Sequence, residues 1–356
     1  MKKQSISDKY EIVFKINGGS FGTAYKAREI GTNHIVTLKQ FKNVSNSIIY
    51  KQALNEIKIL KDLKGSTNII DLIDVEKIES EGSIYLIYEY NEYSICDLIY
   101  QNVQLTFQQI KSYFQQMLSS LQILHSKGYI HCDIKPNNFL ITPNNDVKLI
   151  DFNLSISREK IQTKDDTDSR DIFGTYGYMA PEILLGEANY DYAIDIWSLG
   201  CTFYEILTHE SLLGDNKRES EIANRMIEIF GFPKKDDFPN IMSLPNKDLF
   251  LNSDAHQKTS IDDFLETKLP DKFKSFKPLL VKMLKMNPKQ RISVEDALEF
   301  PLLQEIEIDE LPSLTANELT CNFPISQNRR FRINNHFLRN FYDEYRPLKI
   351  VPLIEV

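Results

Sequence analysis

HCDIKPNNFL, residues 131–140, places a histidine, an aspartate, a lysine and two asparagines within eight positions. Apolar residues flank these polar ones, in GYI before the stretch and in FLI after it. Pro136 and the two asparagines resist regular secondary structure, so the polar residues are expected on a loop. Because buried polar side chains are costly unless they have partners, we interpret the stretch as a site retained for its chemistry.

The composition is that of an ordinary globular protein. The chain has 356 residues, of which 42% are hydrophobic and 26% are charged, and this length favours two lobes over a single core. The formal net charge of −8 argues against binding to nucleic acid or to a membrane surface, because both need a basic face. We therefore expect no nucleic-acid partner and no membrane partner.

The N-terminus and the cysteines indicate the compartment. MKKQSISDKY has no apolar stretch after its lysines and does not resemble a signal peptide, and no run approaches the roughly 18 apolar residues of a membrane helix. The cysteines have neither metal-ligand spacing nor a disulfide framework. They are Cys96, Cys132, Cys201 and Cys321. We expect a reducing setting, cytoplasmic and/or nuclear.

Hydrophobic periodicity divides the chain into a strand-rich region and a helix-rich region. Residues 10–90 have mostly the pattern of strands, interrupted by one helix near 47–63. The apolar residues at helical spacing in that helix are Leu54, Ile57, Leu60 and Leu63. After residue 93 the period becomes helical, and further helical patterns lie at roughly 192–208, 219–230 and 276–286. A strand-rich lobe is therefore predicted to precede a helix-rich lobe, joined near Glu89 to Tyr93.

Two features of the first lobe are candidates for phosphate binding. NGGSFG at 17–22 contains glycines that allow the backbone to approach a ligand and to direct N–H groups toward phosphate oxygens; an ordinary hairpin turn is the equally open alternative. Lys39, in the apolar strand VTLK, needs a partner if it is buried. Glu56 on the predicted helix could supply that partner, unless both side chains face solvent.

The opening stretch supplies the remaining chemistry. Asp133, Lys135 and Asn138 lie close together on the predicted loop, and Asp151 follows the apolar strand VKLI. Carboxylate and amide oxygens suit a hard cation, a lysine neutralises phosphate charge, and a second carboxylate can accept a hydroxyl proton. These residue types are what a magnesium–nucleotide site requires.

In order and spacing, these residues resemble the signature set of eukaryotic protein kinases. The glycine loop, the strand lysine, the helix glutamate, HxDxKxxN, DFx and APE occur in family order. The resemblance implies the two-lobed kinase fold of the α+β class, in which a small antiparallel β-sheet lobe with one helix precedes a larger, mainly helical lobe. The implied parts are a kinase domain at 10–303, its N-lobe at about 10–90, its C-lobe at about 94–303, and a tail of unknown role at 304–356.

The resemblance also implies roles for individual residues. Asp133 would orient the substrate hydroxyl and accept its proton, and Lys135 would steady the γ-phosphate. Asn138 and Asp151 would bind Mg²⁺. DIWSLG at 195–200 resembles the central helix of the family, whose members also pair an arginine, here Arg291, with the glutamate of APE, here Glu182.

ATP is the implied nucleotide. Lys39 would hold its α- and β-phosphates and would itself be positioned by Glu56. Ala24, Thr37 and Leu140 would enclose the adenine, with Tyr88 behind it and the backbone of Glu89 and Asn91 reading the base edge. The full implied set is Ile16, Asn17, Gly18, Gly19, Ser20, Phe21, Gly22, Ala24, Thr37, Lys39, Glu56, Tyr88, Glu89, Asn91 and Leu140. The implied regulatory spine is Leu60, Leu72, His131 and Phe152.

Finer features resemble one branch of the family. Lys135 and Thr175 are typical of serine/threonine kinases, so the implied reaction transfers the γ-phosphoryl group of ATP to Ser/Thr hydroxyls of protein substrates. The second lobe resembles the cyclin-dependent-kinase-like (CMGC) group, which suggests cell-cycle or transcription control, or the role of a kinase that activates cyclin-dependent kinases. YKQALNE is not a cyclin-binding signature, so the sequence does not require a cyclin-like partner. Met179 replaces an arginine usual in the branch, which leaves proline preference open.

Three positions depart from the family pattern. Asn17 replaces the first glycine of the loop and Asn153 replaces the glycine of DFG, and asparagine tolerates left-handed backbone angles better than most residues. Cys132 replaces the arginine that pairs with an activation-loop phosphate; we expect a small buried thiol there, with a redox role as the alternative. We hypothesise that activity does not need phosphorylation in the loop, where the acceptors are Thr163, Thr167 and Ser169.

These departures leave a rival hypothesis open, a pseudokinase that acts as a scaffold or allosteric partner. The catalytic positions themselves are all occupied by the expected residue types. The arginines and aromatics of the tail suggest packing on the kinase core or, as a third alternative, docking of an acidic partner.

Overall fold

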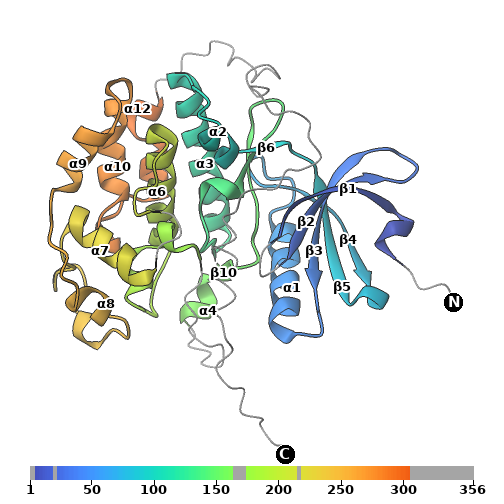
Figure 1. The fold of residues 1–356 in the computed structure, drawn as a ribbon, viewed down its shortest axis with the longest axis horizontal. Helices are drawn as coiled ribbons and strands as arrows, with labels where there is room; N and C mark the ends of the chain where they lie inside the picture. The colour runs from blue at the N-terminus through green and yellow to red at the C-terminus, as the bar shows by residue number, and fades with distance from the viewer. Residues whose placement is uncertain (1–4, 19–21, 163–173, 215–217, 305–356) are drawn as a thin grey trace, which may run out of the picture. The chain divides into compact units, whose positions relative to one another are not determined.

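The computed structural model describes residues 5–18, 22–162, 174–214 and 218–304. Several predictions from the sequence fall outside these ranges: Gly19, Ser20 and Phe21 of the glycine loop, the candidate phosphorylation sites Thr163, Thr167 and Ser169, and the tail beyond Gln304. Within the described ranges, a sheet with one helix beside it is followed along the chain by a mainly helical region (Figure 1). The predicted order of a strand-rich lobe and a helix-rich lobe is confirmed.

The first lobe contains a five-stranded antiparallel sheet. Its strands are β1 (Tyr10–Gly18), β2 (Thr23–Glu29), β3 (Ile35–Lys42), β4 (Leu72–Ile78) and β5 (Ser83–Glu89), in the order β1-β2-β3-β5-β4. In β3, Val36 and Leu38 are buried in the core on one face. Since successive side chains of a strand point to opposite faces, Thr37 and Lys39 share the other face.

Helix α1 (Ser47–Asp62) lies beside the sheet (Figure 1). Its first turn is capped by Asn46, whose side chain accepts a hydrogen bond from the Ile48 N–H. The predicted apolar stripe is partly wrong, because Leu54 is exposed. The residues that α1 buries are Ala53, Glu56, Ile59 and Leu60. A glutamate therefore lies on the buried face, which requires a partner for its charge.

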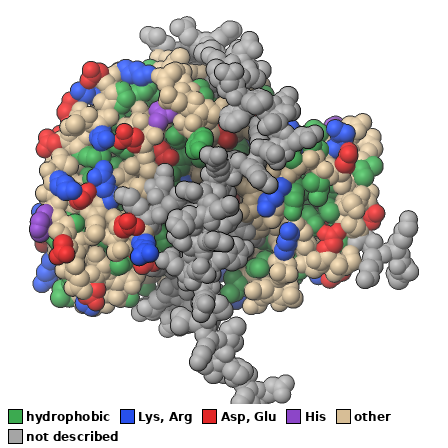
Figure 2. Space-filling model, viewed as in Figure 1, with side chains coloured by type: hydrophobic (Ala, Val, Ile, Leu, Met, Phe, Trp, Pro, Cys, Tyr) green, Lys and Arg blue, Asp and Glu red, His purple; other side chains and the backbone are tan. Residues whose placement is uncertain are grey.

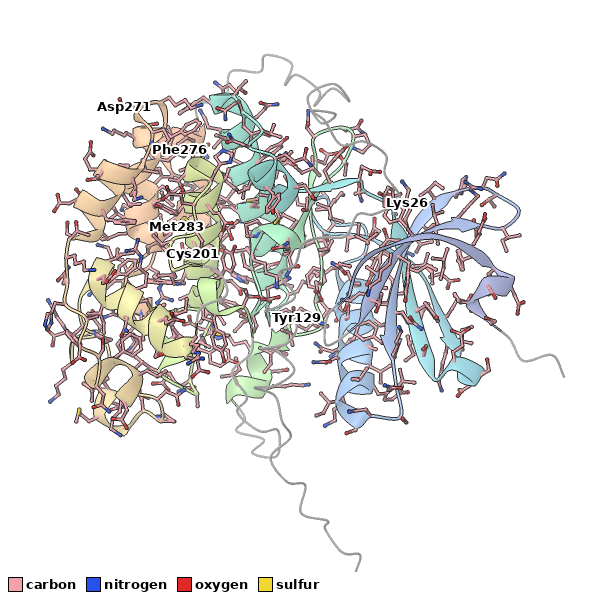
Figure 3. The ribbon with its side chains drawn as sticks, viewed as in Figure 1. Lys26, Tyr129, Cys201, Asp271, Phe276 and Met283 are labelled. Carbon is pink, nitrogen blue, oxygen red and sulfur yellow. The ribbon has the colours of Figure 1, made fainter. Side chains whose placement is uncertain are left out.

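The second lobe is built around two long helices, α3 (Phe107–Ser126) and α6 (Ala193–Thr208). Thr106 and Gln109 form a capping box at the start of α3. In α6 every residue from Ile194 to Leu207 is buried, so this helix is the core of the lobe. Gly200 lets Leu284 and Met283 pack closely, since a Cβ at position 200 would lie 2.9 Å from Leu284 Cδ2; Figure 3 shows Cys201 and Met283 near each other in this core.

The other elements are shorter. The remaining α-helices are α2 (Ile95–Tyr100), α4 (Arg158–Gln162), α5 (Pro181–Leu184), α7 (Glu219–Phe230), α8 (Asp248–Leu251), α9 (Ile261–Lys268), α10 (Lys277–Met283), α11 (Val294–Leu298) and α12 (Pro301–Gln304). The 3₁₀ turns are η1 (Ile6–Asp8), η2 (Glu79–Glu81), η3 (Pro136–Asn138), η4 (Tyr176–Tyr178), η5 (Ile241–Ser243), η6 (Asp271–Phe276) and η7 (Pro288–Gln290).

Two small sheets fix the polar loops of the second lobe. β7 (Tyr129–Ile130) pairs with β10 (Ile156–Ser157), and β6 (Tyr93–Ser94), β8 (Phe139–Ile141) and β9 (Val147–Leu149) form a three-stranded sheet. The stretch 131–138 connects β7 to β8, and the stretch 150–155 connects β9 to β10. Both polar loops are therefore anchored by strands at their two ends.

The surface and the helices bear on the expected partners. Acidic and basic side chains are interspersed over the described face seen in Figure 2, so they create no large field of one sign there. Among the described residues, no helix combines the length and the apolar character that crossing a membrane would demand.

Candidate active site

The loop 131–138 is held by the central helix α6. Asp195 of α6 accepts hydrogen bonds from the backbone N–H of His131 at 2.8 Å and of Cys132 at 3.0 Å. His125 lies 2.9 Å from the same carboxylate. Cys132 has φ of 68°, a left-handed conformation that non-glycine residues rarely adopt. The two N–H bonds to one carboxylate explain how this strained turn is maintained.

His131 orients the residue that follows the turn. Its ring is fully buried, and burial lowers the pKa of the imidazole, which favours the neutral form. Nδ1 accepts the Asp133 N–H at 3.3 Å, while Nε2 faces the Ile150 carbonyl at 3.0 Å. The ring also packs edge-on against Phe152, with centroids 5.3 Å apart. His131 thus joins the two polar loops.

Asp133 lies in a closed cluster of hydrogen bonds. Lys135 Nζ is 2.6 Å from Asp133 Oδ2, the Thr175 hydroxyl donates to Oδ1 at 2.8 Å, and Lys135 Nζ also donates to Thr175 Oγ1 at 2.8 Å. The Asn138 amide donates to the Asp133 backbone carbonyl at 2.7 Å. Because its neighbours fix both oxygens of the carboxylate, Asp133 has one defined orientation.

Lys39 connects the sheet lobe to the second lobe. Its ammonium is 2.6 Å from Glu56 Oε2 and 2.7 Å from Asp151 Oδ1. Burial alone would lower the pKa of Lys39, but the charges of Asp151 and Glu56 outweigh burial and raise this pKa above its usual value. The lysine is therefore charged and paired. The predicted pairing of Lys39 with Glu56 is confirmed, and the alternative in which both face solvent is wrong.

Glu56 has a second partner. Its Oε1 accepts the Tyr88 hydroxyl at 2.8 Å, and its side chain is 1% exposed. Burial raises the pKa of Glu56, against the opposing effect of Lys39. Burial and the neighbouring Glu56 charge also raise the pKa of Tyr88 well above its usual value, so this tyrosine remains a donor at neutral pH.

Asp151 and Asn138 are neighbours that could hold a cation. The N–H of Ile150 donates to the Asn138 backbone carbonyl at 3.0 Å, which joins the two loops at this point. Burial alone would raise the pKa of Asp151, but Lys39 outweighs burial and holds this pKa below its usual value. The Asn138 nitrogen bonds to Asp133, which leaves the amide oxygen as the donor atom for a ligand.

This donor set suits Mg²⁺ better than a metal held by protein alone. The described part of the chain contains no group of three or more His, Cys, Asp or Glu side chains placed to bind a metal ion. Mg²⁺ is usually held by only one or two carboxylates together with substrate phosphates. An ionised carboxylate beside an amide oxygen fits that pattern.

The glycine-loop positions within the described ranges have two different roles. Asn17 and Gly18 belong to β1, opposite Ala24 and Thr23 of β2. Gly22 is required for packing, because a Cβ there would lie 2.7 Å from the backbone carbonyl oxygen of Gln40. Asparagine tolerates left-handed backbone angles, but neither Asn17 nor Asn153 has a positive φ; in the polar loops Cys132 and Asp151 have one.

Some of the residues predicted to enclose a base are neighbours of Lys39 in the sheet. Ala24 pairs with Lys39 in the β2–β3 register, and Thr37 pairs with Tyr88 in the β3–β5 register. Ile16, Ala24, Thr37, Asn91 and Leu140 are half-buried, whereas Glu89 is exposed. The half-buried side chains are accessible enough to contact a ligand.

Comparisons with known proteins agree with this geometry. The family described as "Protein kinase domain" matches residues 10–303. The chain belongs to the protein kinase family. The expected two-lobed α+β kinase fold is thereby confirmed.

Curated relatives of this kinase are serine/threonine kinases of the CMGC group. The Serine/threonine-protein kinase ppk23 of Schizosaccharomyces pombe is 30% identical over 310 residues, covering 86% of this chain and 75% of the relative. Extracellular signal-regulated kinase 2 of Dictyostelium discoideum is 29% identical over 346 residues, covering 94% and 92%. Cyclin-dependent kinase 12 of Drosophila melanogaster is 32% identical over 318 residues, 86% of this chain but 26% of that protein. This chain is a divergent CMGC serine/threonine protein kinase and acts on protein substrates.

The kinase also contains the buried ion pair expected in its second lobe. Arg291 binds Glu182 through both guanidinium nitrogens, with Nη2 2.6 Å from Oε2. Both side chains are almost completely buried. The pairing predicted from NPKQR and APE is confirmed, and it fixes the segment that follows Thr175 to the helical core.

Some contacts of this kinase could not be inferred from its motifs. Thr175 was expected only as a marker of serine/threonine kinases, yet it contacts Asp133 and Lys135 directly. Asn55 and Tyr129 carry no motif, and both bind across the boundary between the lobes. Cys132 is half-buried rather than fully buried, and its thiol faces the Ile130 carbonyl at 3.7 Å.

Proposed function

We propose that this kinase binds ATP with Mg²⁺ between its two lobes and that Asp133 is its catalytic residue. The supporting observation is the position of Lys39, which makes ion pairs with Glu56 of the first lobe and Asp151 of the second. A lysine held in this way offers a fixed positive charge to phosphates, and phosphoryl transfer depends mainly on positioning and on electrostatic stabilisation. Members of the protein kinase family generally use ATP and Mg²⁺.

Each polar residue has a proposed role in the transfer. Asp133 orients the Ser or Thr hydroxyl of a protein substrate and accepts its proton. Lys135, bonded to Asp133 at 2.6 Å, also contacts the γ-phosphate. Asn138 and Asp151 hold Mg²⁺, which when bound neutralises phosphate charge. Thr175 keeps Asp133 and Lys135 in register through its two hydrogen bonds.

The nucleotide occupies the face of the sheet that carries Lys39. Lys39 holds the α- and β-phosphates, while Ala24, Thr37 and Leu140 enclose the adenine. Tyr88 lies at the back of this site, and its hydroxyl donates a hydrogen bond to Glu56 at 2.8 Å. The backbone of Glu89 and Asn91 binds the base edge, and the complete proposed nucleotide-binding set also includes Ile16, Asn17, Gly18, Gly19, Ser20, Phe21 and Gly22.

The proposal extends to domain limits and compartment. We assign the kinase domain to residues 10–303, with the lobes divided between about 90 and 94, and leave 304–356 as a tail of unknown role. The described cysteines Cys132 and Cys201 are free thiols, which supports a reducing cytoplasmic or nuclear setting.

Regulation and pathway form a finer part of the proposal. Cys132 offers no positive charge to a phosphate, which supports activity without phosphorylation of the activation loop. The similarity to cyclin-dependent kinases supports a role in cell-cycle or transcription control, as such a kinase or as an activator of one, with a cyclin-like partner neither required nor excluded by the sequence.

One experiment tests the function and separates it from the pseudokinase hypothesis. The full chain is produced in bacteria, treated with phosphatase, and incubated with ATP, Mg²⁺ and a Ser/Thr peptide library beside the Asp133→Asn variant. We expect phosphate transfer by the wild type alone. Equal signals from the two proteins would support a scaffold, and activity only after loop phosphorylation would refute the proposed independence from the phosphate. The library also reports whether proline is preferred after the phosphorylated residue.

A further inference from the structure

Helix α1 is tied to the second lobe by a hydrogen bond from Asn55, the residue next to Glu56. Asn55 Nδ2 donates to the backbone carbonyl of Ser155 at 2.6 Å and approaches that of Phe152 at 3.4 Å. Both acceptors belong to the stretch that follows Asp151. Because donor and acceptors are neutral, this contact does not depend on any charged group or phosphate.

A second tie lies farther along the same helix. The hydroxyl of Tyr129 donates to Asp62 Oδ2 at 2.5 Å, and Figure 3 shows Tyr129 at the boundary between α1 and the helical lobe. Burial, followed by the hydrogen bond to Asp62, raises the pKa of Tyr129 to about 12, so the donor stays protonated at neutral pH. Asn55 and Asp62 are about two helical turns apart and therefore lie on one face of α1.

Both hydrogen bonds reach one small sheet or the residues next to it. Tyr129 belongs to β7, and Ser155 directly precedes β10, the strand paired with β7. β7 leads into His131 and Asp133, and β10 follows Asp151 and Phe152 along the chain. The Ser155 hydroxyl also donates to the His131 carbonyl at 3.2 Å. The sheet β7–β10 is thus shared by α1 and by both catalytic loops.

We propose that Asn55 and the Tyr129–Asp62 pair are positioning residues that hold α1 against the β7–β10 sheet and thereby keep Glu56 paired with Lys39. This inference rests on the proposed function, because it assigns the pairing a role in phosphate transfer. Helix α1 is held by side chains of the kinase itself, at two points on one face. Loss of either tie lets α1 move away and lowers the fraction of molecules in which Lys39 is correctly placed.

The test compares variants of the full chain. Asn55→Ala removes the first tie, and Tyr129→Phe removes the hydroxyl of the second with little change of shape. Asp62→Asn keeps an acceptor oxygen for Tyr129 and is expected to retain activity. Asn46→Ala is the matched control, since it removes the N-cap of the same helix and lowers stability without touching either tie.

We expect kcat to fall about tenfold in Asn55→Ala and about threefold in Tyr129→Phe, with KM for the peptide unchanged. Amide hydrogen exchange in 47–62 should rise in both variants, and Asn46→Ala should lower the melting temperature while keeping the wild-type kcat. A purely structural role would lower melting temperatures without a selective loss of kcat.

Failure of the inference is distinguishable from failure of the proposed function. If Asn55→Ala and Tyr129→Phe keep the wild-type kcat and the wild-type exchange in α1 while Asp133→Asn is inactive, the positioning role is refuted and the function stands. If the wild type is as inactive as Asp133→Asn, the function is refuted. In that case amide hydrogen exchange in α1 still tests the positioning role. Faster exchange in Asn55→Ala and Tyr129→Phe than in the wild type supports the role, and unchanged exchange refutes it.

Discussion

Two lysines of this kinase contact carboxylates at nearly the same distance, yet their surroundings differ. Lys135 contacts Asp133, two residues away, at 2.6 Å within one loop. Lys39 contacts Glu56, 17 residues away, and Asp151, 112 residues away. The first pair exists wherever the loop folds, whereas the second exists only when sheet, α1 and second lobe are assembled. We therefore propose that the loop provides the chemistry, whereas the Lys39 cluster forms only when the lobes are correctly arranged.

The largest effect should come from the loop. Asp133→Asn keeps the size of the side chain and one acceptor oxygen for Lys135 but removes the base. General-base catalysis contributes about 10²–10⁴-fold, so we expect kcat to fall about 10³-fold with KM for ATP nearly unchanged. Steady-state kinetics provides the measurement. A variant that retains a tenth of the activity would show that Asp133 only supports the loop.

The Lys39 cluster should respond differently. Lys39→Met removes a phosphate-binding charge and leaves Glu56 buried without it, so we expect kcat/KM for ATP to fall about 10²-fold and the melting temperature to drop. The double variant Lys39→Met/Glu56→Gln should recover part of the lost stability but not activity, because it removes the buried Glu56 charge, whereas the more exposed Asp151 still lacks its lysine. If the double variant were as unstable as the single one, Glu56 would not be the main partner of Lys39.

Thr175 tests the local order of the loop. Thr175→Val replaces its hydroxyl by a methyl group, and both hydrogen bonds to Asp133 and Lys135 are lost. Hydrogen bonds to charged groups contribute about 1.5–3 kcal/mol, so kcat should fall about tenfold, with Thr175→Ser retaining activity. Thr202→Val is a matched control, because that hydroxyl bonds only within its own helix at 3.0 Å. Equal kcat values for Thr175→Val and Thr202→Val would contradict this role.

The smallest effect concerns pH and His131. Because its pKa is lowered in the folded protein, the unfolded chain binds the proton more readily below about pH 6.5. Stability from this group is therefore present above pH 6.5 and declines as pH falls, with a limiting slope of about 1.4 kcal/mol per pH unit. The free energy of unfolding, measured with urea between pH 5 and 7, should fall less steeply with decreasing pH in His131→Gln than in the wild type. Identical pH dependence in both proteins would show that His131 does not titrate in this range.

The comparison of the two lysines also explains what the sequence could predict. Motif spacing singled out Asp133, Lys135 and Asn138, which find partners within their own loop, and Asp151, whose partner Lys39 lies on a distant strand. It also suggested the pairs Lys39–Glu56 and Glu182–Arg291, because family order relates residues that are distant along the chain. The composition and period of 10–90 and 107–126 were sufficient to separate a sheet lobe from a helical lobe.

Contacts that depend on backbone atoms of other segments could not be predicted. Asn55 binds carbonyl groups of Phe152 and Ser155, and every residue has a carbonyl, so no sequence pattern marks the acceptor. Leu54 was wrongly placed in the apolar stripe, because the buried face of α1 includes Glu56, whose charge is neutralised by Lys39. Asn17 and Asn153 were singled out for their tolerance of left-handed angles, but in the polar loops Cys132 and Asp151 are the residues with positive φ.

The central claim is that the assembled Lys39 cluster and the Asp133 loop transfer phosphate without a phosphate on the activation loop. The most direct measurement is the initial rate of γ-phosphoryl transfer from ATP to a Ser/Thr peptide by phosphatase-treated full chain without any partner. The account predicts a rate about 10³-fold above that of Asp133→Asn. A rate equal to that of Asp133→Asn, restored only after phosphorylation at Thr163, Thr167 or Ser169, would contradict it.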